Sequence, residues 1–220
     1  MLWQSSKWIS NIQNKRTMRF PSFRRSGAIP EKTIQNRAPL FRREFEVEFS
    51  VKSAMLYVSG LGYYEAWINH HRVGDHVLDP AQTDYEKRVF YVSYDVTDLI
   101  QTGKNCLGIM LGNGWYNQNR ISRNAKFSYG PPCLICEIQI TVGNGNVLVI
   151  PSDKSWCWSQ GPIIDDNIYA GESYDARLER VGWDMPDFNA TDWAPVIVVR
   201  GPGGHLEPQL IPPIRKIEEL

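Results

Sequence analysis

The stretch GLGYYEAWINHHRVG, Gly60–Gly74, decides the fold, because its bulky side chains alternate as they would along an extended chain. In a β-strand, successive side chains point to opposite faces of the sheet. One face here carries Tyr64, Ala66 and Ile68, and the other carries Tyr63, Glu65 and Trp67. A polar run beginning at Asn69 then ends the segment. We expect the first face to enter the core of a β-sandwich.

The opposite face, with Trp67, needs either a cover or a role. An N-terminal arm that contains Trp3 and Trp8 is the candidate cover. The alternative is a sugar-stacking surface, since an aromatic ring presents a flat apolar body with a polar rim. We expect burial beneath the arm, with sugar stacking as the second interpretation.

The same pattern of short apolar runs and turn signals recurs along the chain, whereas helical periodicity is nearly absent. A hairpin is predicted at Gly143–Asn146, where Gly and Asn accept positive φ. The predicted strands are residues 40–49, 54–61, 63–68, 87–96, 105–112, 133–142 and 146–151. Strands at this spacing, separated by Gly- and Pro-rich turns, favour an all-β sandwich over a βαβ fold.

Charge is unevenly distributed although the net charge is zero. Residues 1–38 hold eight Lys and Arg against one acid. Such an arm could bind nucleic acid or a membrane surface. No basic helix or zinc motif accompanies it, so we expect an arm that packs on the sandwich and neither of those partners. We predict an arm over 1–38, a sandwich domain over 39–200 and a C-terminal linker over 201–220.

Features of membrane-spanning or secreted proteins are missing from the sequence. No apolar run approaches the ~18 residues of a membrane-spanning helix, and the N-terminus lacks the apolar region of a secretory signal. Cys133 and Cys136 form a CxxC pattern, but residues three apart on a strand point to opposite faces. We therefore expect reduced thiols and, by default, a cytoplasmic protein.

Two long stretches carry a family resemblance. They are residues 59–117, SGLGYYEAWINHHRVGDHVLDPAQTDYEKRVFYVSYDVTDLIQTGKNCLGIMLGNGWYN, and residues 161–196, GPIIDDNIYAGESYDARLERVGWDMPDFNATDWAPV. Together with LEPQLIPPIRKIEEL at 206–220 they resemble the N-terminal β-sandwich region of bacterial α-L-rhamnosidases. The resemblance implies a jelly-roll β-sandwich similar to galactose-binding domains.

The resemblance also implies what this chain does not do. Enzymes of this family carry out hydrolysis in an (α/α)6 barrel with paired carboxylates, downstream of the sandwiches, and these 220 residues hold no such barrel. We expect a truncated product or a leading module, which binds a rhamnose-containing glycan or supports a downstream catalytic domain. A purely structural spacer is the alternative, and an autonomous glycosidase is a further one. A sandwich that evolved against a partner domain could also form a homo-oligomer.

A sugar site is expected at LGNGWYN and in the loop that follows the last predicted strand. Asn113 could bond a hydroxyl, and Trp115 could stack on the apolar face of a deoxy sugar, unless the motif is a strand end with a core-capping Trp. In DDNIYAGESYDAR, we predict sugar contacts at Asp166 and Asn167, with Glu172 supporting them.

The same acidic loop raises the question of a metal. Hard oxygen ligands at this density suit Ca²⁺, with Asp165 and Asp166 as its candidate ligands. The alternative is structural: Asn167 and Asp175 would fix the loop backbone, and Arg177 would pair with a neighbouring acid.

No catalytic residue is predicted. Glycoside hydrolysis needs one protonated and one ionised carboxyl group across a cleft. Neighbouring acids in a single wet loop share one environment, which gives no reason for their pKa values to separate.

Overall fold

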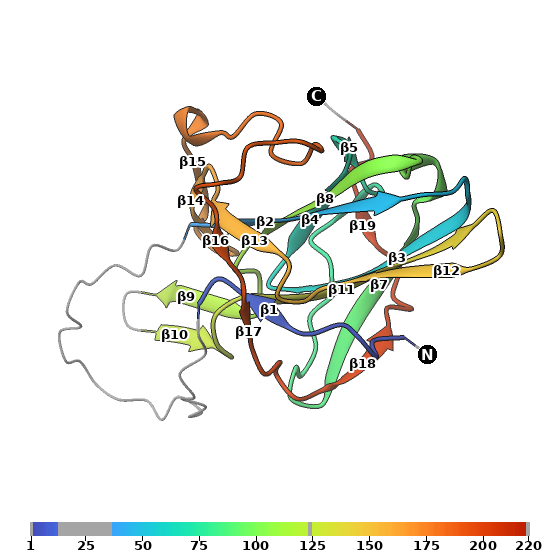
Figure 1. The fold of residues 1–220 in the computed structure, drawn as a ribbon. Coiled ribbons are helices and arrows are strands. Elements are labelled where there is room, and N and C mark those ends of the chain that lie inside the picture. The colour runs from blue at the N-terminus through green and yellow to red at the C-terminus, as the bar shows by residue number, and fades with distance from the viewer. Residues whose placement is uncertain (1, 13–36, 123–124, 219–220) are drawn as a thin grey trace.

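Two β-sheets packed face to face form the body of the molecule, and each recruits strands from distant parts of the chain (Figure 1). The computed structural model describes residues 2–12, 37–122 and 125–218. The first sheet has the order β17-β1-β11-β3-β7-β18, with β12 paired to β11. Its strands are β1 (Ile9–Ser10), β3 (Val51–Leu61), β7 (Arg88–Asp95), β11 (Cys133–Val142), β12 (Val147–Pro151), β17 (Ile197–Val198) and β18 (His205–Pro208).

The second sheet has the order β16-β13-β2-β8-β4-β5, and all its pairs are antiparallel. Its strands are β2 (Pro39–Val47), β4 (Tyr64–Ile68), β5 (His71–Arg72), β8 (Gly103–Leu111), β13 (Cys157–Gln160) and β16 (Ala194–Pro195). In the first sheet β18 runs parallel to β7. The predicted all-β sandwich is thereby confirmed, and each of the seven predicted segments forms a strand.

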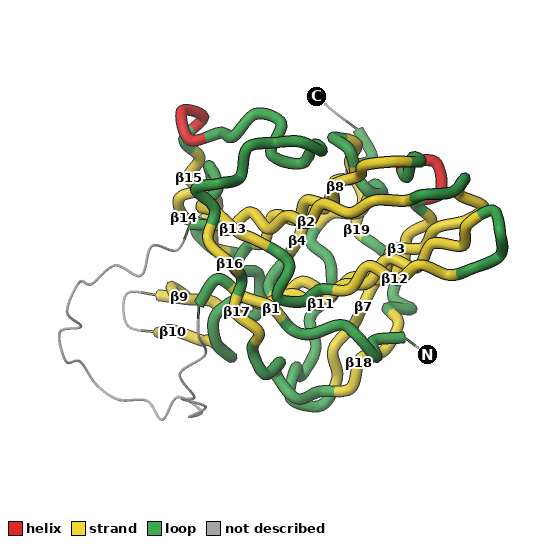
Figure 2. Tube along the Cα trace, in the orientation of Figure 1, coloured by secondary structure: helices red, strands yellow, loops and turns green. Residues whose placement is uncertain are grey.

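Outside the two main sheets, the regular elements of the described residues are three two-stranded ribbons and two short 3-10 turns (Figure 2). The ribbons pair β6 (His76–Val77) with β19 (Ile214–Arg215), β9 (Asn117–Ser122) with β10 (Ala125–Ser128), and β14 (Ile163–Asn167) with β15 (Gly171–Tyr174). The 3-10 turns are η1 (Thr97–Leu99) and η2 (Ala176–Leu178). Within the described residues, no helix is long and apolar enough to cross a membrane.

The core lies between the two sheets and takes the face of β4 that the alternation predicted. Tyr64, Ala66 and Ile68 are 7%, 2% and 0% exposed. They join one large cluster of buried side chains that includes Ile109 of β8 and Ile138 of β11. Burying such aliphatic side chains stabilises the fold by roughly 1.5–3 kcal/mol each before entropy is counted.

Local turn chemistry follows the sequence at the turn after β4 and at the predicted hairpin between β11 and β12. Asn69 and His70 join β4 to β5 with φ values of 51° and 70°, which Asn tolerates better than most residues. The Asn69 side chain also binds the Leu99 carbonyl at 2.9 Å. Between β11 and β12, Gly145 has φ 86°, and the Val142 N–H donates to Asn146 O at 2.9 Å.

The cysteines behave as the strand geometry predicted. Cys136 lies in the main core cluster and Cys133 in a second, smaller cluster around Leu61 and Tyr85, so the two thiols face opposite sides of β11. All four cysteines are free. Burial raises the pKa of Cys133 to about 12 and that of Cys136 further still, so both remain neutral thiols at ordinary pH.

The cover of the outer face of β4 differs from the prediction. Trp67 packs on Trp183 at 5.6 Å between ring centroids, so residues 180–193 provide the cover. Gly108 of β8 makes room for the Trp183 ring, because a Cβ there would lie 2.7 Å from it. Trp3 instead packs against Tyr91 of the other sheet at 5.4 Å. The prediction that Trp3 and Trp8 cover Trp67 was therefore wrong.

The arm and the C-terminal segment both contribute strands to the first sheet. Ile9 of β1 pairs with Leu134 of β11, and Trp8 packs beside the second cluster. His205 of β18 pairs with Arg88 of β7. Residues 13–36 of the predicted arm lie outside the described residues, and the domain boundaries at 38 and 200 stay predictions.

A buried arginine ties the covering segment to the sheet. Arg42 of β2 is 4% exposed, and its Nε donates to the Trp183 carbonyl at 2.9 Å. Its Nη2 donates to the Met185 carbonyl at 2.9 Å and also bonds the Glu44 carboxylate. The covering segment is thus held by polar bonds as well as by the edge-to-face contact of Trp183 with Trp67.

Candidate functional site

The predicted residues Asn113 and Asp166 meet where the turn after β8 reaches β14. The backbone N–H of Asn113 donates to Asp166 Oδ1 at 2.7 Å, and its Nδ2 donates to Asp166 Oδ2 at 2.9 Å. Asn117 Nδ2 donates in turn to Asn113 Oδ1 at 2.7 Å. Asn113 is only 4% exposed. These two side chains therefore mainly bind each other and fix the β8 turn against β14.

Two glycines, Gly62 after β3 and Gly114 of LGNGWYN, allow a close approach of backbone to backbone. A Cβ on Gly62 would lie 1.9 Å from the Asn113 carbonyl oxygen, and one on Gly114 would lie 2.8 Å from the Tyr63 amide nitrogen. Gly114 also has a φ of 47°. Only glycine allows these two segments to pass so closely, so the space beside these glycines is occupied by the protein's own chain.

The Asp166 carboxyl group has a perturbed titration. Burial raises its pKa, while the hydrogen bonds from Asn113 act in the opposite direction by favouring the charged form. Asp165 and Glu172 also raise this pKa through their charges.

The acidic loop shows the contacts that the structural alternative predicted. Asn167 is 7% exposed, and its Oδ1 accepts hydrogen bonds from the backbone N–H groups of Tyr169 and Ala170 at 2.9 and 3.0 Å. The Asp175 carboxylate accepts hydrogen bonds from Arg177 Nη2 at 2.6 Å and from Arg177 Nε at 2.8 Å. Hydrogen bonding to Arg177 lowers the pKa of Asp175 to about 2.

The outward part of this site is aromatic. Trp115 is half-buried and meets the ring of Tyr169 edge to face, with 5.6 Å between centroids. Tyr169 is 60% exposed, and Glu172 lies exposed on β15, opposite Asp166 in register. Sequence reasoning missed Tyr169, because a single Tyr in a turn gives no periodic signal. We call Trp115, Tyr169 and Glu172 the aromatic site.

The donor set does not by itself form a calcium site. Among the described residues, no three His, Cys, Asp or Glu side chains lie close enough together to hold a metal ion. Both carboxylate oxygens of Asp166 already accept hydrogen bonds from Asn113. The expected Ca²⁺ at Asp165 and Asp166 stays a prediction.

A second surface feature lies around the β6–β19 ribbon. Large apolar side chains are exposed there, which we call the apolar strip: Leu78 (49%), Leu210 (88%), Ile211 (50%), Ile214 (56%) and Ile217 (99%). Gln209 Nε2 donates to Asp79 Oδ1 at 3.0 Å, and Arg215 pairs with Asp75 at 2.7 Å. These bonds fix the ribbon to the sandwich, so the strip is a positioned surface.

Comparison with known proteins gives one consistent family. The model for the alpha-L-rhamnosidase N-terminal domain matches residues 49–218. An alpha-L-rhamnosidase of Formosa agariphila is 35% identical over 99% of this chain and 24% of that protein. The chain thus spans about a quarter of the length of this relative.

Two solved structures extend the likeness to the fold. The alpha-L-rhamnosidase from Dictyoglumus thermophilum has a TM-score of 0.79 at 39% identity, over 97% of this chain and 23% of that one. The alpha-L-rhamnosidase from Aspergillus terreus has a TM-score of 0.82 at 37% identity, over 98% of this chain and 24% of that one.

Proposed function

The chain belongs to the family of alpha-L-rhamnosidase N-terminal domains, and on that premise we propose that it is an accessory, non-catalytic module. In this proposal it packs against the catalytic remainder of an α-L-rhamnosidase and helps to hold it in place. The single observation that carries the proposal is the apolar strip on the β6–β19 ribbon.

The strip has the properties of an interface between domains. A surface patch of several exposed apolar side chains often marks an interaction site, whereas a single exposed apolar residue does not. Leu210 and Ile217 are the most exposed of them, at 88% and 99%. Relatives are about four times as long as this chain, because it covers 24% of the Formosa agariphila protein. The remainder of such a protein is the partner we propose for the strip.

A binding experiment tests this directly. The 220-residue chain is titrated calorimetrically with the Formosa agariphila relative from which the matching N-terminal region has been removed. We expect association, and a loss of at least about tenfold in affinity for the Leu210→Asp/Ile217→Asp double variant, since burying a charge without a partner is costly.

Val147→Asp is the matched control, because Val147 is apolar, 58% exposed and outside the strip. It should bind like the parent chain. An affinity that is the same for the parent, the strip variant and the control would contradict the proposal.

The proposal also predicts no hydrolysis by this chain alone. Asp166 is bonded to Asn113 and Asp175 to Arg177, so neither carboxylate is free to act on a glycosidic bond. An aryl α-L-rhamnoside incubated with the chain should release no phenol above the buffer rate. Release that disappears in both Asp166→Asn and Glu172→Gln would establish an autonomous glycosidase instead.

A second candidate function, glycan binding, rests on the aromatic site. Trp115 and Tyr169 present two rings at right angles, with the Glu172 carboxylate nearby as an acceptor for hydroxyl groups. L-rhamnose, which has an apolar methyl group, is the sugar that we expect there. A spacer domain without sugar affinity is the competing interpretation.

Nuclear magnetic resonance titration with L-rhamnose, with and without Ca²⁺, separates these two. Binding should shift the amide resonances of residues 112–117 and 165–172 and be lost in Trp115→Ala. A requirement for Ca²⁺ would support the predicted metal at Asp165 and Asp166. If rhamnose shifts no resonance under either condition, the domain is a spacer.

A further inference from the structure

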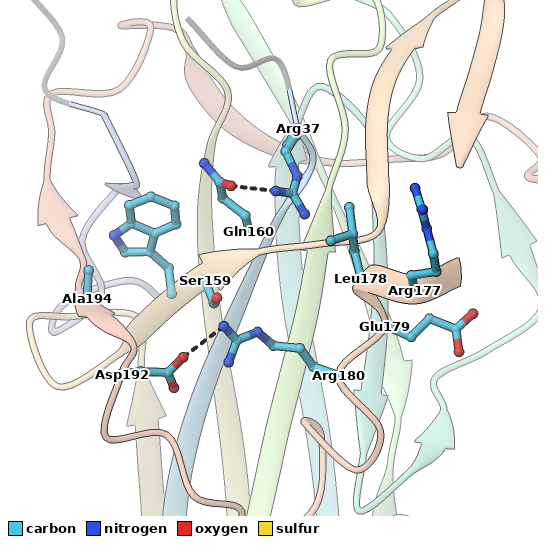
Figure 3. Close-up of a pocket in the computed structure, with 10 residues that line it drawn as sticks. Arg37, Ser159, Gln160, Arg177, Leu178, Glu179, Arg180, Asp192 and Ala194 are labelled. Carbon is cyan, nitrogen blue, oxygen red and sulfur yellow. Dashed lines mark hydrogen bonds and ion pairs between the residues drawn. The ribbon is translucent and has the colours of Figure 1, made fainter. Parts of the chain in front are cut away.

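A polar groove opens beside β13, on residues that the aromatic site and the apolar strip do not use (Figure 3). Its volume is about 600 Å³, within the roughly 300–1,000 Å³ typical of small-molecule sites. The lining comes from β13, from the chain around η2 and from β16, together with Arg37. The residues that matter for its chemistry are Arg37, Trp158, Ser159, Gln160, Arg180 and Asp192.

The guanidinium groups of this groove are held in place before any ligand arrives. Arg180 Nη2 donates to Asp192 Oδ2 at 2.8 Å, and the Arg180 guanidinium lies 5.7 Å from the centre of the Trp193 ring. Arg37 Nη1 donates to Gln160 Oε1 at 2.7 Å (Figure 3). Arg37 also donates from Nη2 to the Gly161 carbonyl at 2.8 Å. Such preorganisation lowers the entropy cost of binding.

Two of the three arginines that line the groove are paired with carboxylates, which argues against a simple anion site. Arg180 is paired with Asp192, and Arg177 with Asp175. Glu179, which also lines the groove, accepts a hydrogen bond from the Tyr174 hydroxyl at 2.6 Å. An anion would meet carboxylates beside the guanidinium groups. A ligand with many hydroxyl groups would find donors and acceptors side by side, because each hydroxyl can both donate and accept.

The aromatic component points the same way. Trp158 lines the groove and is half-buried, packed partly against the main core. An indole supplies an apolar wall on which the carbon face of a pyranose can lie. Gln160 and Arg177 flank the β14–β15 ribbon in sequence, and that ribbon carries Glu172 of the aromatic site.

We propose that this groove is a second saccharide subsite, which takes an uncharged glycan of at least two sugar units. Trp158 forms its apolar wall, and Arg180, Asp192 and Gln160 bond adjacent hydroxyl groups. The proposal rests on the glycan-binding function proposed above and deepens it, since a glycan rather than a single rhamnose becomes the ligand.

The test is a titration of the 220-residue chain with rutinose, a neutral rhamnosyl-glucose disaccharide, followed by nuclear magnetic resonance. The indole N–H of Trp158 and the side-chain amide of Gln160 should shift. Arg180→Gln should lower the affinity about tenfold, because it removes charge-assisted hydrogen bonds. Raising NaCl from about 0.05 to 0.5 M should change the dissociation constant less than about threefold, since the ligand is uncharged.

Two matched variants keep the test interpretable. Trp158→Phe retains an aromatic ring in the core and should weaken binding only moderately. Arg88→Gln removes an exposed arginine paired with Glu207, outside the groove, and should bind like the parent chain.

The outcomes separate the two proposals. Rhamnose shifts at Trp115 and Tyr169, with no rutinose shift at Trp158 or Gln160, would overturn the groove and leave the aromatic site intact. Preference for a disaccharide that carries a carboxylate, with strong salt dependence, would overturn the uncharged ligand. If neither sugar shifts resonances at either site, both glycan proposals are overturned. The binding test of the apolar strip does not depend on that outcome.

Discussion

The two faces of the second sheet are built by different means. Its inner face is sealed by regularly alternating apolar side chains, such as Ala66 and Ile109, which are 2% and 0% exposed. Its outer face is covered by residues 180–193, through the edge-to-face contact of Trp67 with Trp183 and the hydrogen bonds of Arg42. The inner face depends on a local pattern, whereas the outer face depends on contacts between segments more than one hundred residues apart, such as Arg42 and Trp183.

The difference teaches where this fold is cooperative and where it can open locally. Core side chains lose contacts only when the sheets separate. The covering segment is held by a few polar anchors, so it could detach while the sandwich persists. The following substitutions break or sharpen that contrast, beginning with the largest expected effect.

Ile109→Ala should be the most destabilising change. Ile109 is fully buried between Phe41 and Ala66 in register, so the truncation leaves a cavity in the main core. We expect a loss of roughly 2–5 kcal/mol in the free energy of unfolding, measured by urea denaturation. Val149→Ala on β12, where Val149 is 37% exposed, should change it by less than about 0.5 kcal/mol. Equal losses in the free energy of unfolding for both variants would contradict the claim that the inner face contributes most to stability.

Arg42→Met should release the outer cover. The change leaves the carbonyls of Trp183 and Met185 without their donor, and each buried unsatisfied group costs about 1–3 kcal/mol. We expect a loss of about 2–3 kcal/mol and new proteolytic cleavage within residues 180–193. Arg88→Met, which removes an exposed ion pair with Glu207, should cost under about 1 kcal/mol. A protected segment 180–193 in the Arg42 variant would contradict local release.

Asp166→Ala should loosen the β8 turn from β14. It removes both carboxylate acceptors of Asn113, so that the Asn113 N–H lies buried without this partner and Nδ2 keeps only the Asp166 backbone carbonyl at 3.3 Å. We expect a loss of about 2 kcal/mol. The matched change Glu172→Ala, on the exposed partner of Asp166 in register, should be nearly neutral. Comparable losses at both positions would mean that the Asn113–Asp166 bonds contribute nothing particular.

The pH dependence of Asp166 should be the smallest effect. Burial raises its native pKa above 3.8, so the native state holds the proton more tightly than the unfolded chain does. The free energy of unfolding therefore falls as pH rises from about 3.8 through the native pKa, and Asp166→Asn should abolish that decrease.

Asp175 provides a control of opposite sign. Its native pKa of about 2 lies below the ordinary 3.8, so its contribution is present above 3.8 and is lost as pH falls towards 2. Urea midpoints of Asp166→Asn and Asp175→Asn, measured against pH, should deviate from the parent in opposite directions. Deviations in the same direction would show that one of the two pKa assignments is wrong.

Much of the sandwich was predictable because alternation is a local signal. Each predicted strand between residues 40 and 151 is present, and the face of β4 that enters the core is the predicted one. The short strands after Trp156 were missed, because β13, β16 and β17 are two to four residues long and lie in sequence rich in Gly, Pro and Asp. Their pairing depends on distant partners, which a local pattern does not encode.

The candidate site was predictable in its position but not in its detail. Sequence reasoning placed Asn113 and Asp166 in one site, and the structure brings them within 2.9 Å. It did not foresee that they would use their polar groups on each other. The packing of Trp183 on Trp67 could not be predicted either. The only indication in the sequence is Gly108, which lies on a different strand and makes room for the Trp183 ring.

The parallel strand β18 has a consequence for solubility. The first sheet begins at β17 and ends at β18, and both strands come from residues 197–208. Residues 197–208 thus supply the strands that pair with the otherwise open edges of β1 and β7 in the first sheet. Unpaired margins invite strands from other molecules, so this late segment acts as a guard against aggregation. Cutting the chain after Val198 would expose the backbone of β7, even though every core residue of that strand would remain.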